Sequence, residues 1–186
     1  VKNNDISQKI KYQLTQSETS TSSSSTANSI TGEEGVEITT SSISHSLSQD
    51  TRDSFFNPTS GYNWRFQNTI AGIGGDAEFF KSILNFKSYY PIDYGEYIFG
   101  LKSGVGFITA FEDKITSSNR FFLGGKTLRG FDSDGVGPRD TSVDESLGGT
   151  DLTVGRAEVS FPLGLPKELN MYGGVFGEMG KVWGLD

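Results

Sequence analysis

The chain has 186 residues, a formal net charge of −7 and no cysteine. The missing thiols exclude a disulfide framework and thiolate metal sites, and the negative charge argues against nucleic acid as the main partner. No run of about 18 apolar residues is present, which excludes a transmembrane helix. The chain opens on a polar stretch without the apolar segment of a signal peptide and ends abruptly after a strand-like run, so we expect a fragment of a longer protein.

Alternation of apolar and polar residues, the two-residue period of β-strands, dominates the chain. In the clearest example Tyr62, Trp64 and Phe66 fall on one face, while Asn63 and Arg65 fall on the other. The same pattern predicts seven strands, at about residues 5–16, 36–50, 61–73, 77–91, 95–110, 151–162 and 169–183.

The length of these strands favours a membrane protein. Most exceed ten residues, whereas strands of soluble proteins usually have about 5–6, and a tilted strand needs about 9–11 residues to cross a membrane. The connections at 92–96 and 162–168 are short, and those at 17–35 and 111–150 are long. The sequence therefore predicts an all-β fold, an antiparallel transmembrane β-barrel whose long loops lie outside the cell.

Two local features agree with this prediction. Tyr89, Tyr90 and Tyr97 flank the short turn at 92–96, as an interfacial aromatic girdle would. The segment Ser17–Ser29 is polar and of low complexity, which is typical of a mobile external loop and equally of a solvated linker.

Three short motifs resemble chemical sites but fail on detail. Asp132–Gly135 is similar to the start of a calcium loop, but the twelfth position is Val143 rather than Glu. Gly124–Thr127 is similar to a phosphate loop, but Arg120 stands where that motif needs glycine. His45, the only histidine, lies in a Ser- and Thr-rich strand without the motif around a catalytic serine. We therefore expect no enzymatic activity, no metal and no cofactor.

Four segments resemble the BamA-type outer-membrane protein assembly factors. The first, Gln49–Phe66, carries the family's Asp-x-Arg-Asp turn and Pro-Thr-x-Gly. The second, Phe121–Phe131, resembles the hallmark of the sixth external loop: Gly-Gly, then a β-branched residue followed by Arg-Gly-Phe. Phe86–Ile92 and Val175–Trp183 match strand patterns of the family.

Two positions depart from the family pattern. Leu128 replaces the β-branched residue, and Glu178 stands where the family usually has Asp. The residues of the turn that match are Asp50, Arg52, Asp53, Pro58, Thr59 and Gly61. We expect these turn residues to have a structural role on the periplasmic side.

The resemblance extends from about Ile38 to Trp183. It implies that residues 1–186 are part of one C-terminal barrel domain, covering the seventh to thirteenth of sixteen strands, without the POTRA domains, the first strands and the last three. The implied function is the folding and insertion of β-barrel proteins in the bacterial outer membrane, where substrate strands pair with a weak seam between the first and last strands. Implied partners are unfolded barrel proteins, the lipid bilayer and accessory lipoproteins.

Other classes of protein stay open at this point. Related transporters for polypeptide secretion, of the two-partner or the translocation-and-assembly type, share the Arg-Gly-Phe loop. A diffusion porin would lack it, and a soluble β-sandwich would need no detergent.

The resemblance also implies a lock inside the barrel, formed by Leu128, Arg129, Gly130 and Phe131. The sixth loop would fold into the lumen, where Arg129 meets carboxylates and Phe131 anchors the loop by packing. Strand alternation independently places Glu158 and Glu178 on the inward face, opposite their apolar neighbours. Gly124 and Gly125, with Gly130, would let the loop backbone approach the wall.

Overall fold

The computed structural model describes residues 5–18, 37–112, 115–141, 144–164 and 171–185. Most of the predicted external loop at Ser17–Ser29 lies outside these residues. None of the helices in the described ranges is long and apolar enough to cross a membrane.

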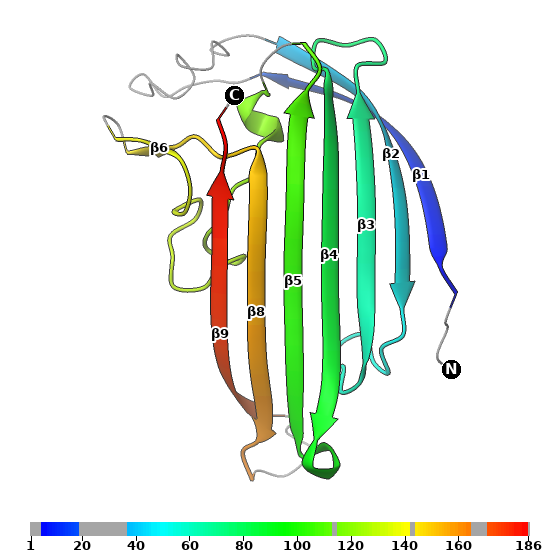
Figure 1. Ribbon diagram of the computed structural model, residues 1–186, viewed down its shortest axis with the longest axis vertical. Coiled ribbons are helices and arrows are strands. Elements are labelled where there is room, and N and C mark those ends of the chain that lie inside the picture. The colour runs from blue at the N-terminus through cyan, green and yellow to red at the C-terminus, as the bar shows by residue number, and fades with distance from the viewer. Residues whose placement is uncertain (1–4, 19–36, 113–114, 142–143, 165–170, 186) are drawn as a thin grey trace.

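Seven long strands form one antiparallel sheet, and their order in space follows the chain (Figure 1). The strands are β1 (Ser7–Glu18), β2 (Glu37–Asp50), β3 (Gly61–Ala71), β4 (Phe79–Ile92), β5 (Tyr97–Ala110), β8 (Asp151–Pro162) and β9 (Tyr172–Trp183). All seven predicted strands are confirmed, and no end differs from its prediction by more than three residues. The sheet is open, with β1 and β9 at its edges.

Short elements lie in the connections. The 3-10 helix η1 (Asp93–Gly95) turns the chain between β4 and β5. A second 3-10 helix, η2 (Ser117–Asn119), and a small pair of strands, β6 (Arg139–Asp140) and β7 (Glu145–Ser146), interrupt the long connection between β5 and β8. In Figure 1 this connection descends beside β8 and β9 instead of extending away from the sheet.

The two faces of the sheet differ in chemistry, because successive side chains of a strand point to opposite faces. We call the face that carries Lys102, Glu158 and Glu178 the inner face, and the other face the outer face. Large apolar side chains are exposed on the outer face, among them Ile43, Ile70, Leu84, Leu101, Val105, Phe107, Val175 and Met179. An apolar surface of this extent is typical of a wall that faces lipid.

The buried core lies on the inner face, where the long connection packs against the sheet. Phe79 and Ile108 of the wall and Phe121, Leu123 and Leu128 of the connection belong to one apolar cluster. The connection is therefore folded against the wall and is not an excursion into solvent.

Two of the three tyrosines predicted to form an aromatic girdle lie on the outer face. Tyr90 and Tyr97 are exposed on the outer face. Tyr89 pairs with Gly100, and its ring lies 3.6 Å from the place that a Cβ on Gly100 would occupy on the inner face. Consecutive residues of one strand cannot both face lipid, so Tyr89 belongs to the interior.

Candidate functional site

The tip of the long connection reaches the inner wall through Arg129. Its backbone N–H donates a hydrogen bond of 2.8 Å to Oε2 of Glu178, and its Nε donates one of 2.5 Å to Oε1 of the same carboxylate. Its second terminal nitrogen lies 3.5 Å from Oε2 of Glu158. The structure thus brings the predicted arginine together with both predicted carboxylates, one on β8 and the other on β9.

Glu178 also binds a second arginine. Nε of Arg156 lies 2.5 Å from Oε1 of Glu178, directly across the β8–β9 pair. The Glu178 side chain is only 5% exposed, whereas that of Arg129 is 38% exposed. Since this carboxylate is shielded from water and bridges two cations, its interactions are screened less than those of a surface ion pair.

An aromatic ring completes the arginine site. The guanidinium carbon of Arg129 lies 3.2 Å from the ring centroid of Phe176, well within the range of a cation–π contact. Phe176 and Glu178 are two residues apart on β9, so they project from the same face. The planar guanidinium is therefore held by a ring and two carboxylates, a combination that a lysine ammonium could not reproduce.

Glycines allow the backbone of the connection to approach this site. Gly124 has φ +146°, and a Cβ there would lie 2.9 Å from the backbone nitrogen of Asp134. Gly130, next to Arg129, has φ +87°. Gly125 has φ +54°, and its N–H donates to the carbonyl oxygen of Phe131 at 3.0 Å. The tip is a compact reversal of the chain that presents Arg129 to the wall.

The apolar residues on either side of Arg129 behave differently from one another. Leu128 is 2% exposed and belongs to the buried cluster, whereas Phe131 is 53% exposed. The expectation that Phe131 anchors the loop by packing is therefore wrong for the described wall. Among the described residues of this motif, Leu128 provides the apolar contact with the cluster.

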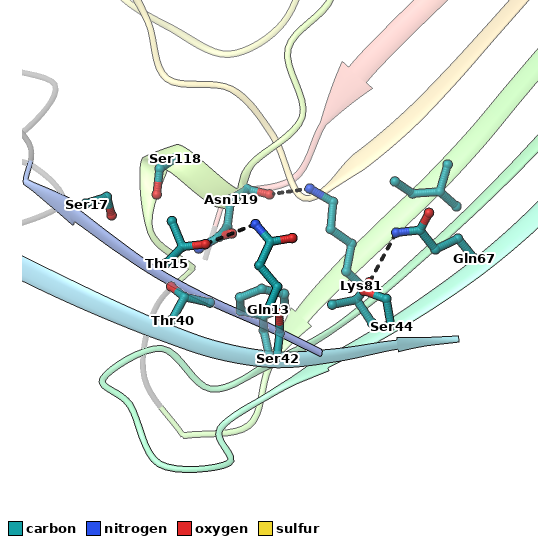
Figure 2. A pocket seen from close by; sticks show the side chains of 13 residues that line it. Gln13, Thr15, Ser17, Thr40, Ser42, Ser44, Gln67, Lys81, Ser118 and Asn119 are labelled. Carbon is teal, nitrogen blue, oxygen red and sulfur yellow. Dashed lines mark hydrogen bonds between the residues drawn. The ribbon is translucent and has the colours of Figure 1, made fainter. Parts of the chain in front are cut away.

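The base of the connection is held by a second cation. Nζ of Lys81 on β4 donates a hydrogen bond of 2.7 Å to the carbonyl oxygen of Asn119 and lies 4.4 Å from the ring centroid of Phe121. Figure 2 shows Lys81 extending toward Asn119 along a cavity of about 370 Å³. Hydroxyl and amide side chains line much of this cavity, including Gln13, Thr15, Thr40, Ser42, Ser44 and Gln67.

Arg120 ties the two ends of the connection together. It is 8% exposed; its Nε donates to the carbonyl oxygen of Ile115 and its Nη1 to that of Leu147, both at 3.2 Å. Neither Arg120 nor Lys81 was among the predicted site residues. The inward position of Lys81 follows from its alternation with Phe80, but the backbone oxygens that these cations bind leave no signal in a sequence.

The predicted periplasmic turn between β2 and β3 is organised by its charged residues. Arg52 forms an ion pair of 2.6 Å with Asp50. Asp53 accepts hydrogen bonds from three backbone amides and from the hydroxyl of Thr59. Desolvation acts to raise the pKa of Asp53, but the hydrogen bonds from Thr59 and its backbone neighbours outweigh it and lower the pKa to about 2.

The other two predicted turn residues shape the backbone. Pro58 lies within the loop that Asp53 closes, and Gly61 starts β3 with φ +95°. A Cβ on Gly61 would lie 2.9 Å from Cα of Arg52, so the two sides of the turn are in close contact there.

The site holds one guanidinium group, that of Arg129, between two carboxylates and an aromatic ring. Among the residues that the structure describes, no three His, Cys, Asp or Glu side chains gather closely enough to hold a metal ion. Arg156 and Phe176 were not predicted as site residues. Their inward faces follow from the alternation around Glu158 and Glu178, but their meeting with Arg129 depends on the path of the long connection.

Comparison with known proteins identifies relatives of the chain. The profile of the Omp85 superfamily domain matches residues 1–186. The outer membrane protein assembly factor BamA of Neorickettsia risticii (strain Illinois) is 37% identical over 147 residues, which cover 78% of this chain and 20% of that protein. A SAM50-like protein of Schizosaccharomyces pombe is 34% identical over 128 residues, covering 66% of this chain and 26% of that one.

A solved structure supports the same fold. The crystal structure of BamA from Haemophilus ducreyi lacking POTRA domains 1-3 superposes with a TM-score of 0.73 at 18% identity, and the match covers 82% of this chain and 31% of that one. The chain therefore spans between a fifth and a third of the length of these three relatives.

Proposed function

The chain belongs to the Omp85 superfamily and forms part of an outer-membrane β-barrel, and from this premise we propose that it serves the folding and insertion of other β-barrel proteins into the outer membrane. The observation that carries the proposal is the 37% identity to an outer membrane protein assembly factor, over 78% of this chain. The similarity to a SAM50-like protein supports the same class of function.

Within such a protein the chain would supply the wall opposite the seam. The proposed complete barrel has sixteen strands, of which residues 1–186 would contribute the seventh to thirteenth, in one C-terminal domain that follows the POTRA domains. Substrate strands would pair with exposed strand edges elsewhere in the protein. This mechanism needs no cofactor and no covalent chemistry, and we propose that the protein is not an enzyme.

Arg129 would act as the lock of this wall. Its contacts join the long connection to β8 and β9 through two carboxylates and a ring. We therefore propose that residues 128–131 hold the connection inside the barrel and keep the wall in one shape while the seam opens.

The proposed partners follow from the same role. They are unfolded outer-membrane β-barrel proteins, the lipid bilayer and accessory assembly lipoproteins. The similarity to a bacterial outer membrane protein assembly factor over 78% of this chain supports a bacterial outer membrane as the location.

Depletion of the full-length protein in its own cell tests the proposal. Folded porins and other barrels would be quantified by heat-modifiable gel mobility. The proposal expects a general loss of folded barrels and an accumulation of unfolded precursors in the periplasm. If bulk barrels stayed normal while one secreted protein disappeared, the polypeptide-secretion transporter would be the correct function.

A further inference from the structure

A row of cations crosses the inner face of the sheet in register. Lys87 of β4 pairs with Lys102 of β5, and Lys102 pairs in turn with Arg156 of β8. We call these three residues the basic row. Side chains at directly paired positions have Cβ atoms about 5 Å apart, and like charges there destabilise a sheet. Three adjacent strands therefore place like charges side by side, which is electrostatically unfavourable. Alternation of polar and apolar residues requires a polar residue at these positions, but not a basic one.

Within the described residues, only one member of this row forms an ion pair with a carboxylate. Arg156 is bound to Glu178, which also binds Arg129. Lys87 and Lys102 form no ion pair with another described residue, and Lys102 stands in register between the two cations Lys87 and Arg156.

The surroundings of the row are positive as well. Arg65 on β3 also faces inward. It pairs with Asn85, which lies two residues before Lys87 on β4. With Arg129 this makes five cations (Arg65, Lys87, Lys102, Arg129 and Arg156) against the two carboxylates Glu158 and Glu178. Asp50, in register beyond Lys87, is neutralised by Arg52, so the local charge is three positive units. The chain as a whole carries −7, so this part of the inner face has the opposite sign to the whole chain.

A cavity of about 330 Å³ adjoins the row on the side of the short turns. Lys102, Ser160 and Glu158, the partner of Arg129, contribute polar groups to its wall, and Tyr89, Tyr172 and Phe56 contribute aromatic rings. Phe56 belongs to the turn between β2 and β3, where it is 87% exposed. A ligand in this cavity would therefore meet both an ammonium group and apolar ring surface.

We propose that the basic row and this cavity bind an acidic segment of an unfolded polypeptide. Carboxylates of the segment would pair with Lys87 and Lys102, which form no ion pair with a described residue, and an apolar side chain would enter the cavity. The cations from Arg65 to Arg156 span four strands, or roughly 14 Å at about 4.8 Å per strand. This length suits an extended peptide and exceeds a single phosphate or sulfate ion. The inference rests on the proposed function in one respect only. That function supplies the source of the segment, which is an unfolded β-barrel protein that the assembly factor inserts.

Direct binding to the purified full-length protein in nanodiscs tests the inference. The probe is a fluorescent peptide of about ten residues with Asp at alternate positions and one Phe, so that its carboxylates share one face. A matched peptide carries Asn in place of each Asp. Anisotropy would be measured at about 50 mM and about 300 mM salt, because ionic contacts weaken as the screening length shortens.

The inference expects the Asp peptide to bind more tightly than the Asn peptide, with the difference decreasing at the higher salt concentration. The double variant Lys87→Gln, Lys102→Gln should lower the affinity for the Asp peptide about tenfold, since each exposed contact contributes up to about 1 kcal/mol. The matched control is Lys9→Gln, Lys11→Gln, because these lysines share the inner face but lie on β1, away from the row. Heat-modifiable mobility would establish that both variants are folded.

Three results would overturn the inference: equal binding of the two peptides, unchanged affinity in the Lys87 and Lys102 variant, or displacement of the peptide by inorganic phosphate at equal ionic strength. The last would assign the row to small anions. Failure here is distinct from failure of the proposed function. Loss of barrels on depletion without peptide binding would overturn only the inference, and peptide binding with normal barrels on depletion would overturn only the assembly function.

Discussion

The long connection between β5 and β8 is held at its tip and at its base by cations in opposite environments. At the tip, Arg129 is 38% exposed and meets two carboxylates and a ring. At the base, the more enclosed Lys81 meets a carbonyl oxygen and a ring. The tip contact depends on opposite charges and on the fork of an arginine, whereas the base contact depends on one hydrogen bond and on packing. The tip should therefore be the more sensitive to charge, and the base to shape.

The largest effect is expected when Glu178 is removed. Glu178→Ala leaves the guanidinium groups of Arg129 and Arg156 without their shared carboxylate, and loss of one partner from a buried ion pair costs about 3–5 kcal/mol. We expect the tip to detach from the wall, measured as faster protease cleavage near residue 129 in the full-length protein. Glu158→Gln is the matched control, because its carboxylate lies 3.5 Å from Arg129 and is 28% exposed. Equal cleavage in the two variants would contradict the central role of Glu178.

The second effect concerns the geometry of Arg129. Arg129→Lys keeps the charge but loses the planar fork that contacts Glu178, Glu158 and the ring of Phe176 together. We expect it to restore less than half of the barrel assembly that Arg129→Ala loses, measured as the amount of folded porin in a depletion strain. Full activity of the lysine variant would show that charge alone holds the tip.

A smaller effect is expected at the base. Lys81→Met keeps most of the side-chain volume but removes the hydrogen bond to Asn119 and the cation–π contact with Phe121, worth together about 1–3 kcal/mol. Protease cleavage near residue 119 should rise while cleavage near residue 129 stays close to normal. Simultaneous release of both sites would mean that base and tip form one cooperative unit.

The smallest effect is expected at the periplasmic turn, far from both contacts. The folded-state pKa of Asp53 is about 2, below its usual value of 3.8. The carboxylate therefore stabilises the turn fully above about pH 4, and this contribution is lost as the pH falls from about 4 toward 2. Asp53 is exposed, so solvent screening keeps the effect small.

Hydrogen exchange of the amides of Ser54, Thr59 and Ser60 would measure this loss. Their protection should decrease between about pH 4 and pH 2 in the native protein. Asp53→Asn should show low protection at every pH. An unchanged protection of the native protein across this window would contradict the role assigned to the Asp53 carboxylate.

Sequence patterns and tertiary structure contributed different parts of the site. The inward faces of Glu158 and Glu178 were predictable, because a period of two allows only two faces and their neighbours Ala157 and Met179 are apolar. The partners Phe176 and Arg156 share that parity and were accessible to the same reasoning. The exposure of Phe131 was not predictable, since a short motif does not show which of its two apolar residues the wall buries.

The sequence by itself determined the seven strands, their order, the outer and inner faces and the superfamily, because each of these depends on local alternation or on short motifs. Tertiary structure alone decided which residues meet across the long connection. Arg129 and Glu178 are 49 positions apart, and Lys81 and Asn119 are 38 apart. Contacts between residues so far apart in the sequence depend on the path of the long connection. Backbone hydrogen bonds within the connection and to the sheet fix that path. Strand register likewise brought Lys87, Lys102 and Arg156 into one row, since each residue alone is an ordinary polar position on its strand.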